Sequence, residues 1–317
     1  MSPGSKNSSV LEEQRRLSAR EPNLWLRARI IQAIRRYFIG HGYLEIETPH
    51  LIPAPAPEAH INAVSAGDGF LHTSPELCMK RLLSAGYHKI FQICRCFRHG
   101  ERGELHLSEF SLLEWYRTGI HYMDLMDECE EMILFVSRYL GLREEIEYQG
   151  GKIFLQLPWE RISVKDAFKR YASISLEKAM EIDRFEEAMV EEIEPCLGIA
   201  KPTFLYDYPA SFAALARLKE DDQRLAERFE LYMGGVELAN AFSELTDARK
   251  QEKRFERERD KQRQLGKRVY PIPDKFLKAL PYMPRSAGIA LGVDRLIMVL
   301  INKTRIDDVV SFTPEEL

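Results

Sequence analysis

Apolar residues recur at helical spacing near the start of the chain and again in two later stretches. The first set predicts an amphipathic helix that ends at Gly40 and Gly42, and its apolar positions are Leu24, Ala28, Ile31, Ile34 and Phe38. A second helix is expected over 123–140. A third, over 249–268, carries ten basic and four acidic side chains. Such a charge pattern favours either a solvated helix or a partner-binding surface.

Alternation of apolar and polar residues predicts several strands. A short strand over 43–47 is stopped by Pro49, and 286–301 has the pattern of a glycine-punctuated strand followed by a helix. Two predicted pairs of strands carry the polar residues of interest. They are 90–98 with 108–117, around a polar loop, and 229–233 with the segment from 236, joined by the two-residue turn Gly234-Gly235.

Composition limits the class of protein. The 317 residues carry a formal charge of −4, and 30% of them are charged with both signs mixed, which is typical of a folded globular chain. We expect a flexible polar arm over 1–21 and a single catalytic domain over 22–317. No stretch is apolar enough to span a membrane, and the start of the sequence has no apolar core of a secretory signal.

The five cysteines are odd in number and scattered, which favours a reduced, cytoplasmic environment. Cys94 and Cys96 have the wrong spacing for a zinc knuckle or a redox pair. On strand parity they share one face, and we expect them to be small buried apolar residues.

The hairpin at 229–240 offers a candidate metal site. Its two-residue turn places Tyr232 opposite Glu237, so Glu230 and Glu237 become diagonal neighbours, roughly 7–8 Å apart at Cα. A Mg²⁺ ion, which prefers oxygen ligands, would remove their repulsion; the alternative is two exposed glutamates. Asn240 and Glu244 could join them through a helical turn or a bent strand, and a buried Glu244 requires a cation.

The strand over 108–117 makes a similar point. Its even-numbered positions place Phe110, Glu114 and Tyr116 on one face, where a glutamate among apolar residues needs a positive partner. Arg98 and His106 precede this strand and could donate to phosphate oxygens. The alternative is an internal ion pair between Arg98 and Glu114.

These segments resemble the three motifs of class II aminoacyl-tRNA synthetases. The resemblance extends from about residue 22 to the end of the sequence. The matching segments are Tyr43-Leu-Glu-Ile-Glu-Thr-Pro49 for motif 1, Phe97-Arg98…His106…Phe110…Glu114-Trp115-Tyr116 for motif 2, and Gly288-Ile-Ala-Leu-Gly-Val-Asp-Arg295 for motif 3. It implies an α+β fold in which an antiparallel sheet is flanked by helices, and a homodimer formed through motif 1.

Within the class, Ser74-Pro75-Glu76 and the segment 234–245 resemble the lysine pocket of the lysyl subgroup. Motif 1 begins too early to leave room for an anticodon-binding domain. The chain therefore looks like the stand-alone paralogues that attach (R)-β-lysine to a lysine side chain of elongation factor P, with no tRNA involved. Ala290 stands where lysyl-tRNA synthetases have glycine, and its methyl group could shift the preference among amino acids by about 1–3 kcal/mol.

The resemblance also implies roles for individual residues. Arg98 and Arg295 would be catalytic and would hold the phosphates of ATP, and Glu230 and Glu237 would hold Mg²⁺. The implied ATP site comprises Arg98, Glu101, His106, Leu107, Phe110, Glu237, Leu238, Gly292 and Arg295. The implied site for β-lysine or lysine comprises Ser74, Pro75, Glu76, Glu114, Tyr116, Asn240, Glu244 and Ala290.

Motif 2 departs from the family pattern in two places. The customary glutamate after Phe-Arg-Asn is replaced by Gly100, with a carboxylate one position later at Glu101, and Leu107-Ser108 replaces Asn-Pro. Three other readings are open: a truncated lysyl-tRNA synthetase that makes lysyl-adenylate for another acceptor, an asparagine-synthetase-type paralogue, and a non-catalytic binding module. The acidic residues Glu76, Glu114 and Glu244 disfavour an aspartate pocket.

Overall fold

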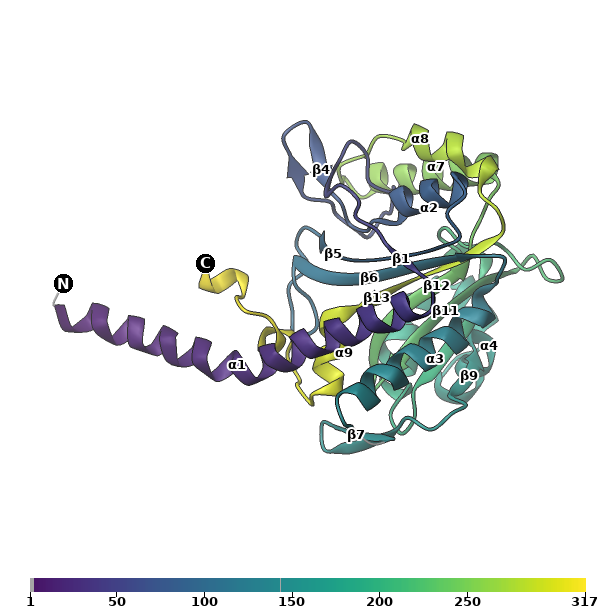
Figure 1. The fold of residues 1–317 in the computed structure, drawn as a ribbon. Helices are drawn as coiled ribbons and strands as arrows, with labels where there is room; N and C mark the ends of the chain where they lie inside the picture. The colour runs from purple at the N-terminus through teal and green to yellow at the C-terminus, as the bar shows by residue number, and fades with distance from the viewer. Residues whose placement is uncertain (1–2, 143) are drawn as a thin grey trace.

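A computed structural model describes residues 3–142 and 144–317, and its centre is an eight-stranded sheet (Figure 1). The sheet is antiparallel except at its two ends, where β1 pairs with β5 and β10 with β9 in parallel. In spatial order its strands are β1 (Leu44–Glu45), β5 (Lys89–Phe97), β6 (Glu109–Thr118), β13 (Ser286–Gly292), β12 (Val236–Ser243), β11 (Leu225–Met233), β10 (Thr203–Pro209) and β9 (Glu160–Ser163). The smaller sheets are β2 (Leu51–Ile52), β4 (Gly69–Leu71) and β3 (Ser65–Ala66), and β7 (Glu145–Tyr148) with β8 (Gly151–Phe154).

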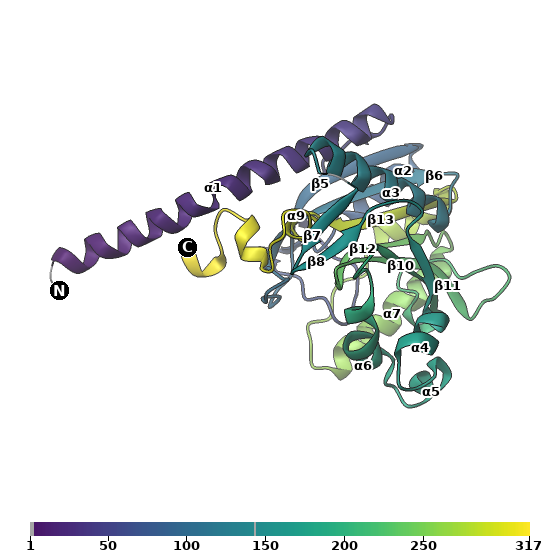
Figure 2. The same cartoon turned by 90° about the horizontal axis from the view of Figure 1, so that it is seen from below.

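Helices cover both faces of the large sheet (Figures 1 and 2). One face packs against α1 (Pro3–Gly40), α3 (Tyr122–Tyr139) and α9 (Val293–Leu300), and the other lies under α2 (Glu76–Ser84), α7 (Ala248–Gln264) and α8 (Asp274–Ala279). The helices α4 (Val164–Tyr171), α5 (Leu176–Glu181) and α6 (Phe185–Ala188), with a π-helix at Met189–Ile193, pack beside β9 and β10. Short 3-10 turns lie at Glu194–Cys196, Ala210–Phe212, Leu280–Tyr282, Ile306–Val309 and Pro314–Glu316.

The predicted helices and strands are confirmed, but burial along the central strands does not alternate. In β6 both Trp115, on the α3 face, and Glu114, on the opposite face, are almost fully buried. Since helices cover both faces, the position of a polar residue in such a strand marks a specific contact rather than a solvated side. In the part of the chain that the structure describes, no helix combines the length and apolarity needed to cross a membrane.

Helix α1 is longer than the sequence pattern predicts. It includes residues 3–21, the segment expected to be a flexible arm, and it continues through Pro22. Polar contacts with distant residues hold part of this stretch: Arg20 bonds Glu316 at 2.6 Å and Asn23 bonds the Asp308 carbonyl at 3.0 Å. The late segment 306–316 therefore lies beside the middle of α1 (Figures 1 and 2).

Candidate active site

A cavity of about 490 Å³ opens on the side of the sheet that α2 and α7 cover. Strands β6, β13 and β12 form its floor. All of the predicted site residues except Pro75, Glu230 and Glu244 line it. Those that line it are Ser74, Glu76, Arg98, Glu101, His106, Leu107, Phe110, Glu114, Tyr116, Glu237, Leu238, Asn240, Ala290, Gly292 and Arg295.

Sheet register brings three of these residues into one row. Ala290 of β13 is opposite Glu114 of β6 on one side and Asn240 of β12 on the other. All three side chains share the face that lines the cavity. The methyl group of Ala290 therefore lies on the cavity floor between a carboxylate and an amide.

The hairpin of β11 and β12 has the predicted pairing of Tyr232 with Glu237, followed by an irregularity that the sequence did not reveal. Between Leu231 and Tyr232 the register shifts by one residue, so that Glu230 is opposite Asn240. A β-bulge of this kind places two residues against one and turns the bulged strand. This allows Glu237 and Asn240, three positions apart, to line the same cavity, and of the two predicted alternatives it is the bent strand that forms.

The acidic end of the cavity centres on Glu114, whose side chain is almost fully buried. Ser74 donates to its Oε1 at 2.5 Å and the Tyr116 hydroxyl donates to its Oε2 at 2.7 Å. Burial, and then the neighbouring Glu76 carboxylate, raise the pKa of Glu114 to about 8. The alternative of an ion pair between Glu114 and Arg98 is not realised, and the positive partner expected for Glu114 is replaced by hydroxyl groups on both of its oxygens.

Glu244 has the cation that its burial requires, and this cation is Lys80 of α2. The Lys80 ammonium forms ion pairs with Glu244 and with Glu76, and Lys80 and Glu244 are fully buried. Burial still raises the pKa of Glu244 to about 8, against the opposing effect of Lys80. Pro75 precedes the first turn of α2 and so directs Glu76 toward this group. The spacing of Glu76 and Lys80, four residues apart on a helix, was the signal that could have revealed the pair.

The basic end of the cavity contains Arg98. Its guanidinium lies 4.9 Å from the centre of the Phe110 ring, and its nearest carboxylate is Glu101 at 3.8 Å. Gly100, with a φ of +81°, makes the turn that brings Glu101 back to Arg98. The Nε atom of Arg98 is buried and has no hydrogen-bond partner among the described residues. An orphaned donor at this position fits an anionic group of a ligand.

Arg295 connects the loop of motif 2 with β12. It donates to the carbonyl oxygens of Leu105 and Glu237 at 3.2 and 2.8 Å and to the Glu237 carboxylate at 3.3 Å. It also lies 2.6 Å from Nε2 of His106. Burial and then the charge of Arg295 lower the pKa of His106, so the neutral ring can accept from the guanidinium. Gly292 lies one turn before Arg295, at the start of α9.

Glu230 and Glu237 differ in exposure, so the alternative of two exposed glutamates is not realised. Glu230 is buried and accepts from the hydroxyls of Tyr208 and Tyr232 at 2.6 and 2.7 Å, and Arg228 donates to it at 2.5 Å. Glu237 faces the cavity. Burial and then the charge of Glu230 raise its pKa. This donor set fits a hard divalent ion.

Two residues that sequence reasoning missed hold the site in shape. Arg228 donates to Asn240 at 3.2 Å as well as to Glu230, and its place in an alternating strand gave no distinctive signal. At Gly288 a Cβ atom would lie 2.2 Å from the Tyr116 ring and 2.6 Å from a Glu244 oxygen. Glycine is therefore required for β13 to pass beneath these two side chains.

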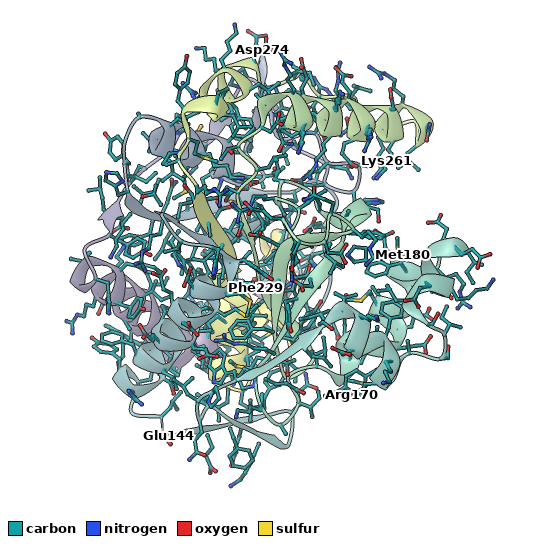
Figure 3. The ribbon with its side chains drawn as sticks, turned by 90° about the vertical axis from the view of Figure 1, so that its right-hand side faces the viewer. Glu144, Arg170, Met180, Phe229, Lys261 and Asp274 are labelled. Atoms are coloured by element: carbon teal, nitrogen blue, oxygen red, sulfur yellow. The ribbon has the colours of Figure 1, made fainter. Side chains whose placement is uncertain are left out.

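The basic helix α7 proves to be a wall of the cavity as well as a solvated helix. Gln251, Arg254, Phe255, Glu258 and Lys261 line the cavity, at the spacing of one helix face. Several of its outer charges pair with each other, for example Arg263 with Asp260. Figure 3 shows α7, with Lys261 labelled, lying across the end of the molecule next to α8.

A third missed residue, Glu58, lies in the proline-rich loop that precedes β3. It lines the cavity, and burial and then the Glu76 charge raise its pKa to about 7. Its backbone is fixed by α7: Gln262 donates to the Glu58 carbonyl at 3.2 Å, and the next amide, of Ala59, donates to Glu258 at 3.0 Å. A carboxylate with this pKa can take up and release a proton near neutrality.

Comparison with known proteins gives two findings. The model of the family described as tRNA synthetases class II (D, K and N) matches residues 9–316. Proteins of Salmonella arizonae and Proteus mirabilis, each named elongation factor P–(R)-beta-lysine ligase, are both 39% identical to this chain. Both matches cover 93% of this chain and 96% of the relative.

Proposed function

The chain belongs to the class II tRNA synthetases of the D, K and N type, and from this membership we propose that it activates (R)-β-lysine with ATP and transfers it to a lysine ε-amine of elongation factor P. The curated relatives carry the name of this reaction. The observation that supports it most directly is the polarity of the cavity. Buried carboxylates gather at one end and arginines at the other, with Ala290 on the floor between them.

The acidic end takes the ammonium groups of the amino acid. Three carboxylates, of Glu76, Glu114 and Glu244, gather at this end, and Lys80 pairs with Glu76 and Glu244. With one internal cation against three carboxylates, this end accommodates up to two further positive charges when all three are ionised. Lysine and β-lysine each carry two ammonium groups at neutral pH. Asn240, fixed by Arg228, offers a polar contact beside them.

The basic end takes the phosphates of ATP. The carboxylate of the amino acid is already ionised at neutral pH and attacks the α-phosphorus in line, with pyrophosphate as the leaving group. Arg98, whose Nε has no partner among the described residues, would neutralise charge on the α-phosphate, and Arg295 and His106 would hold the outer phosphates. Catalysis of this step consists of positioning and charge stabilisation.

Glu237, with Glu230 behind it, would hold Mg²⁺. When bound, this ion neutralises phosphate charge and orients the leaving group. Burial and then the charge of Glu230 raise the pKa of Glu237, and a cation bound by the two carboxylates would oppose both effects. Arg295, which also lines the cavity, donates to the Glu237 carboxylate and so restricts its orientation.

The second step is attack of the acceptor amine on the acyl-adenylate, which releases AMP. The amine must lose a proton, and we assign the proton acceptor to Glu58. The support is its place on the cavity wall, the two hydrogen bonds that fix its loop to α7, and a pKa near 7. Glu58→Gln should slow the transfer to elongation factor P and leave pyrophosphate exchange unchanged.

The reaction is tested by the intact mass of elongation factor P after incubation with the chain, ATP, Mg²⁺ and either lysine isomer. The expected result is a gain of one lysyl unit, larger with (R)-β-lysine. No gain, with amino-acid-dependent pyrophosphate exchange intact, would mean that the adenylate is made for another acceptor. No gain and no exchange would overturn the enzymatic proposal as a whole.

We further propose that the chain forms a homodimer through the surface around α1 and β1. Large apolar side chains are exposed there, with Trp25 at 67%, Ile39 at 59% and Leu44 at 51%. Large apolar side chains that are exposed in a single chain can be covered by a second copy. Sedimentation should give twice the mass of the chain, and Trp25→Glu should shift it toward the monomer.

A further inference from the structure

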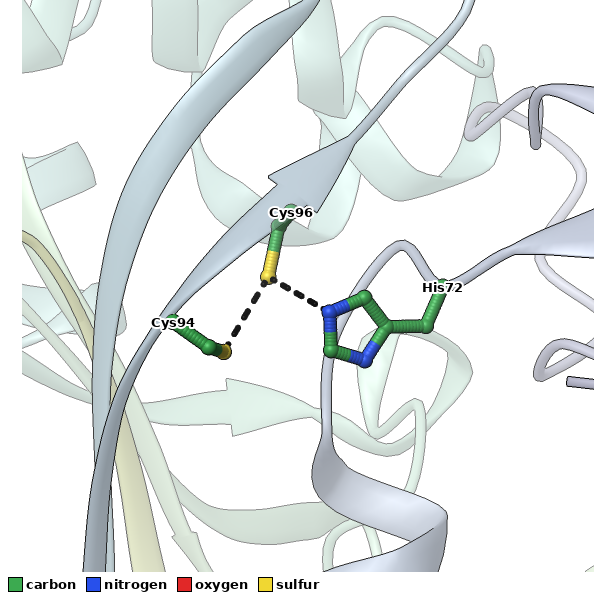
Figure 4. Close-up of side chains that lie close together, drawn as sticks. All are labelled: His72, Cys94 and Cys96. Atoms are coloured by element: carbon green, nitrogen blue, oxygen red, sulfur yellow. Dashed lines mark hydrogen bonds between the residues drawn. The ribbon is translucent and has the colours of Figure 1, made fainter. Parts of the chain in front are cut away.

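Two cysteines and a histidine form a buried group beside the cavity, on the same face of the sheet (Figure 4). The Sγ atoms of Cys94 and Cys96 are 3.9 Å apart, and Nε2 of His72 lies 4.0 Å from Sγ of Cys96. One potential ligand atom from each of the three lies within 4.8 Å of the others. All three side chains are at most 9% exposed.

The backbone fixes these residues in place. Cys94 and Cys96 are alternate residues of β5 and therefore point to the same face. His72 follows β4, and its carbonyl accepts from the Phe97 amide at 3.0 Å, while its own amide donates to the His50 carbonyl at 2.8 Å. The three side chains thus converge from two segments that are tied to each other by hydrogen bonds.

From this geometry we propose that His72, Cys94 and Cys96 bind a thiophilic cation of the Zn²⁺ class. With Zn–S bonds of about 2.3 Å, tetrahedral coordination places two sulfur ligands about 3.8 Å apart, close to the separation observed here. Two thiolates and one imidazole are ligands that select soft or borderline metals over Mg²⁺ or Ca²⁺. The two thiolates would also neutralise the charge of a divalent ion within this buried site.

The contacts of His72 define what metal binding must change. Nε2 of His72 also lies 2.6 Å from the Arg95 carbonyl oxygen, so coordination would replace this hydrogen bond. A disulfide fits less well, because alternate strand residues lie about 6.6 Å apart at Cα, near the upper limit for such a bond.

The position of the group gives the metal a structural consequence. Cys94 and Cys96 pack with Leu112 against Ala290 and Phe110, which line the cavity. His72 lies two residues before Ser74, which donates to Glu114. A metal at this point would fasten the segment that carries Ser74 and Glu76 to the central sheet.

The test uses the full chain, reduced and stripped of metal by a chelator, and then titrated with Co²⁺ as a spectroscopic probe. We expect one equivalent to bind, with a near-ultraviolet thiolate-to-cobalt charge-transfer band and the visible bands of a tetrahedral ion. Zn²⁺ should displace the signal and raise the melting temperature. Absence of the charge-transfer band in the unmodified chain would overturn the proposal without recourse to any variant.

Variants locate the site. Cys94→Ser, Cys96→Ser and His72→Asn should each remove or strongly weaken the bound equivalent, which mass spectrometry of metal content measures independently. The matched controls are Cys129→Ser, a buried cysteine of α3, and His121→Gln, an exposed histidine, and both should retain it. Circular dichroism checks that each variant is folded. Undiminished binding in all three site variants would show that the metal binds elsewhere and would overturn the assignment.

Discussion

The two ends of the cavity differ in how deeply their charged groups are buried and in how these groups are paired. At the acidic end the carboxylates of Glu114 and Glu244 are almost fully buried; hydroxyl groups contact both oxygens of Glu114, and Lys80 pairs with one oxygen of Glu244. At the basic end Arg98 and Arg295 keep 27% and 19% of their side chains exposed, and one donor of Arg98 has no partner among the described residues. The buried groups of the acidic end, which we call the closed end, can discriminate between ligands. The more exposed arginines of the basic end, the open end, can adjust to negative charge that develops during a reaction.

The largest effect is expected at the open end. Arg98→Gln removes the donor proposed to act on the α-phosphate and should lower the rate of amino-acid-dependent pyrophosphate exchange by about 10³-fold, because an arginine that stabilises phosphoryl transfer contributes factors of this order. Arg95→Gln is the matched control, an exposed arginine of β5, the strand that ends immediately before Arg98. Equal loss in both variants would show that the effect is structural.

At the closed end, Glu114→Gln should lower kcat/KM for β-lysine by about 100-fold. Removal of one partner from a buried ion pair costs about 3–5 kcal/mol, and part of this is saved because Glu114 is partly protonated before the ligand binds. Steady-state exchange kinetics measure the change, with KM for ATP unaffected. Glu109→Gln, at an exposed position of the same strand, should leave both parameters unchanged.

Ala290→Gly tests the floor between the two ends. Loss of the methyl group should lower the preference for β-lysine over α-lysine by about 10–100-fold, since one methyl in a binding pocket is worth about 1–3 kcal/mol. Ala287→Gly, on the same strand and directed into the core, controls for backbone flexibility. An unchanged ratio of kcat/KM values would assign the discrimination to another residue.

The smallest effect concerns pH. A carboxylate whose pKa is raised to about 8 is protonated below that pH and binds an ammonium group only after it loses the proton. Affinity for β-lysine should therefore increase by about tenfold between about pH 7 and pH 9, with proton release at the lower pH. Calorimetry in two buffers of different ionisation enthalpy measures the released proton. A flat profile would contradict the raised pKa of Glu114.

Much of the fold could be predicted because the strand and helix periods are strong and the glycine turns are local. The alternation in β6 correctly placed Phe110, Glu114 and Tyr116 on one face. The β-bulge between Leu231 and Tyr232 could not be predicted, because the shift in register depends on the neighbouring strands rather than on any local residue type.

The missed parts of the site depend on contacts between distant segments. Lys80 could have been found from its spacing to Glu76, but its pairing with Glu244 joins residues of α2 and the end of β12. Glu58 lies in a loop with no periodic pattern, and only its hydrogen bonds to α7 fix its place. The proximity of His72 to the two cysteines could not be predicted for the same reason, since no sequence spacing connects them.

The contacts of α1 with the segment 306–316 have a consequence for the order of folding. Arg20 and its partner Glu316 are 296 positions apart, and Asn23 bonds a carbonyl 285 positions later. Protein synthesis proceeds from the amino end, so the middle of α1 emerges from the ribosome long before these partners exist. This part of the surface of nascent α1 therefore stays uncovered until all of the large sheet has been synthesised, so the final docking of α1 is a late event of folding.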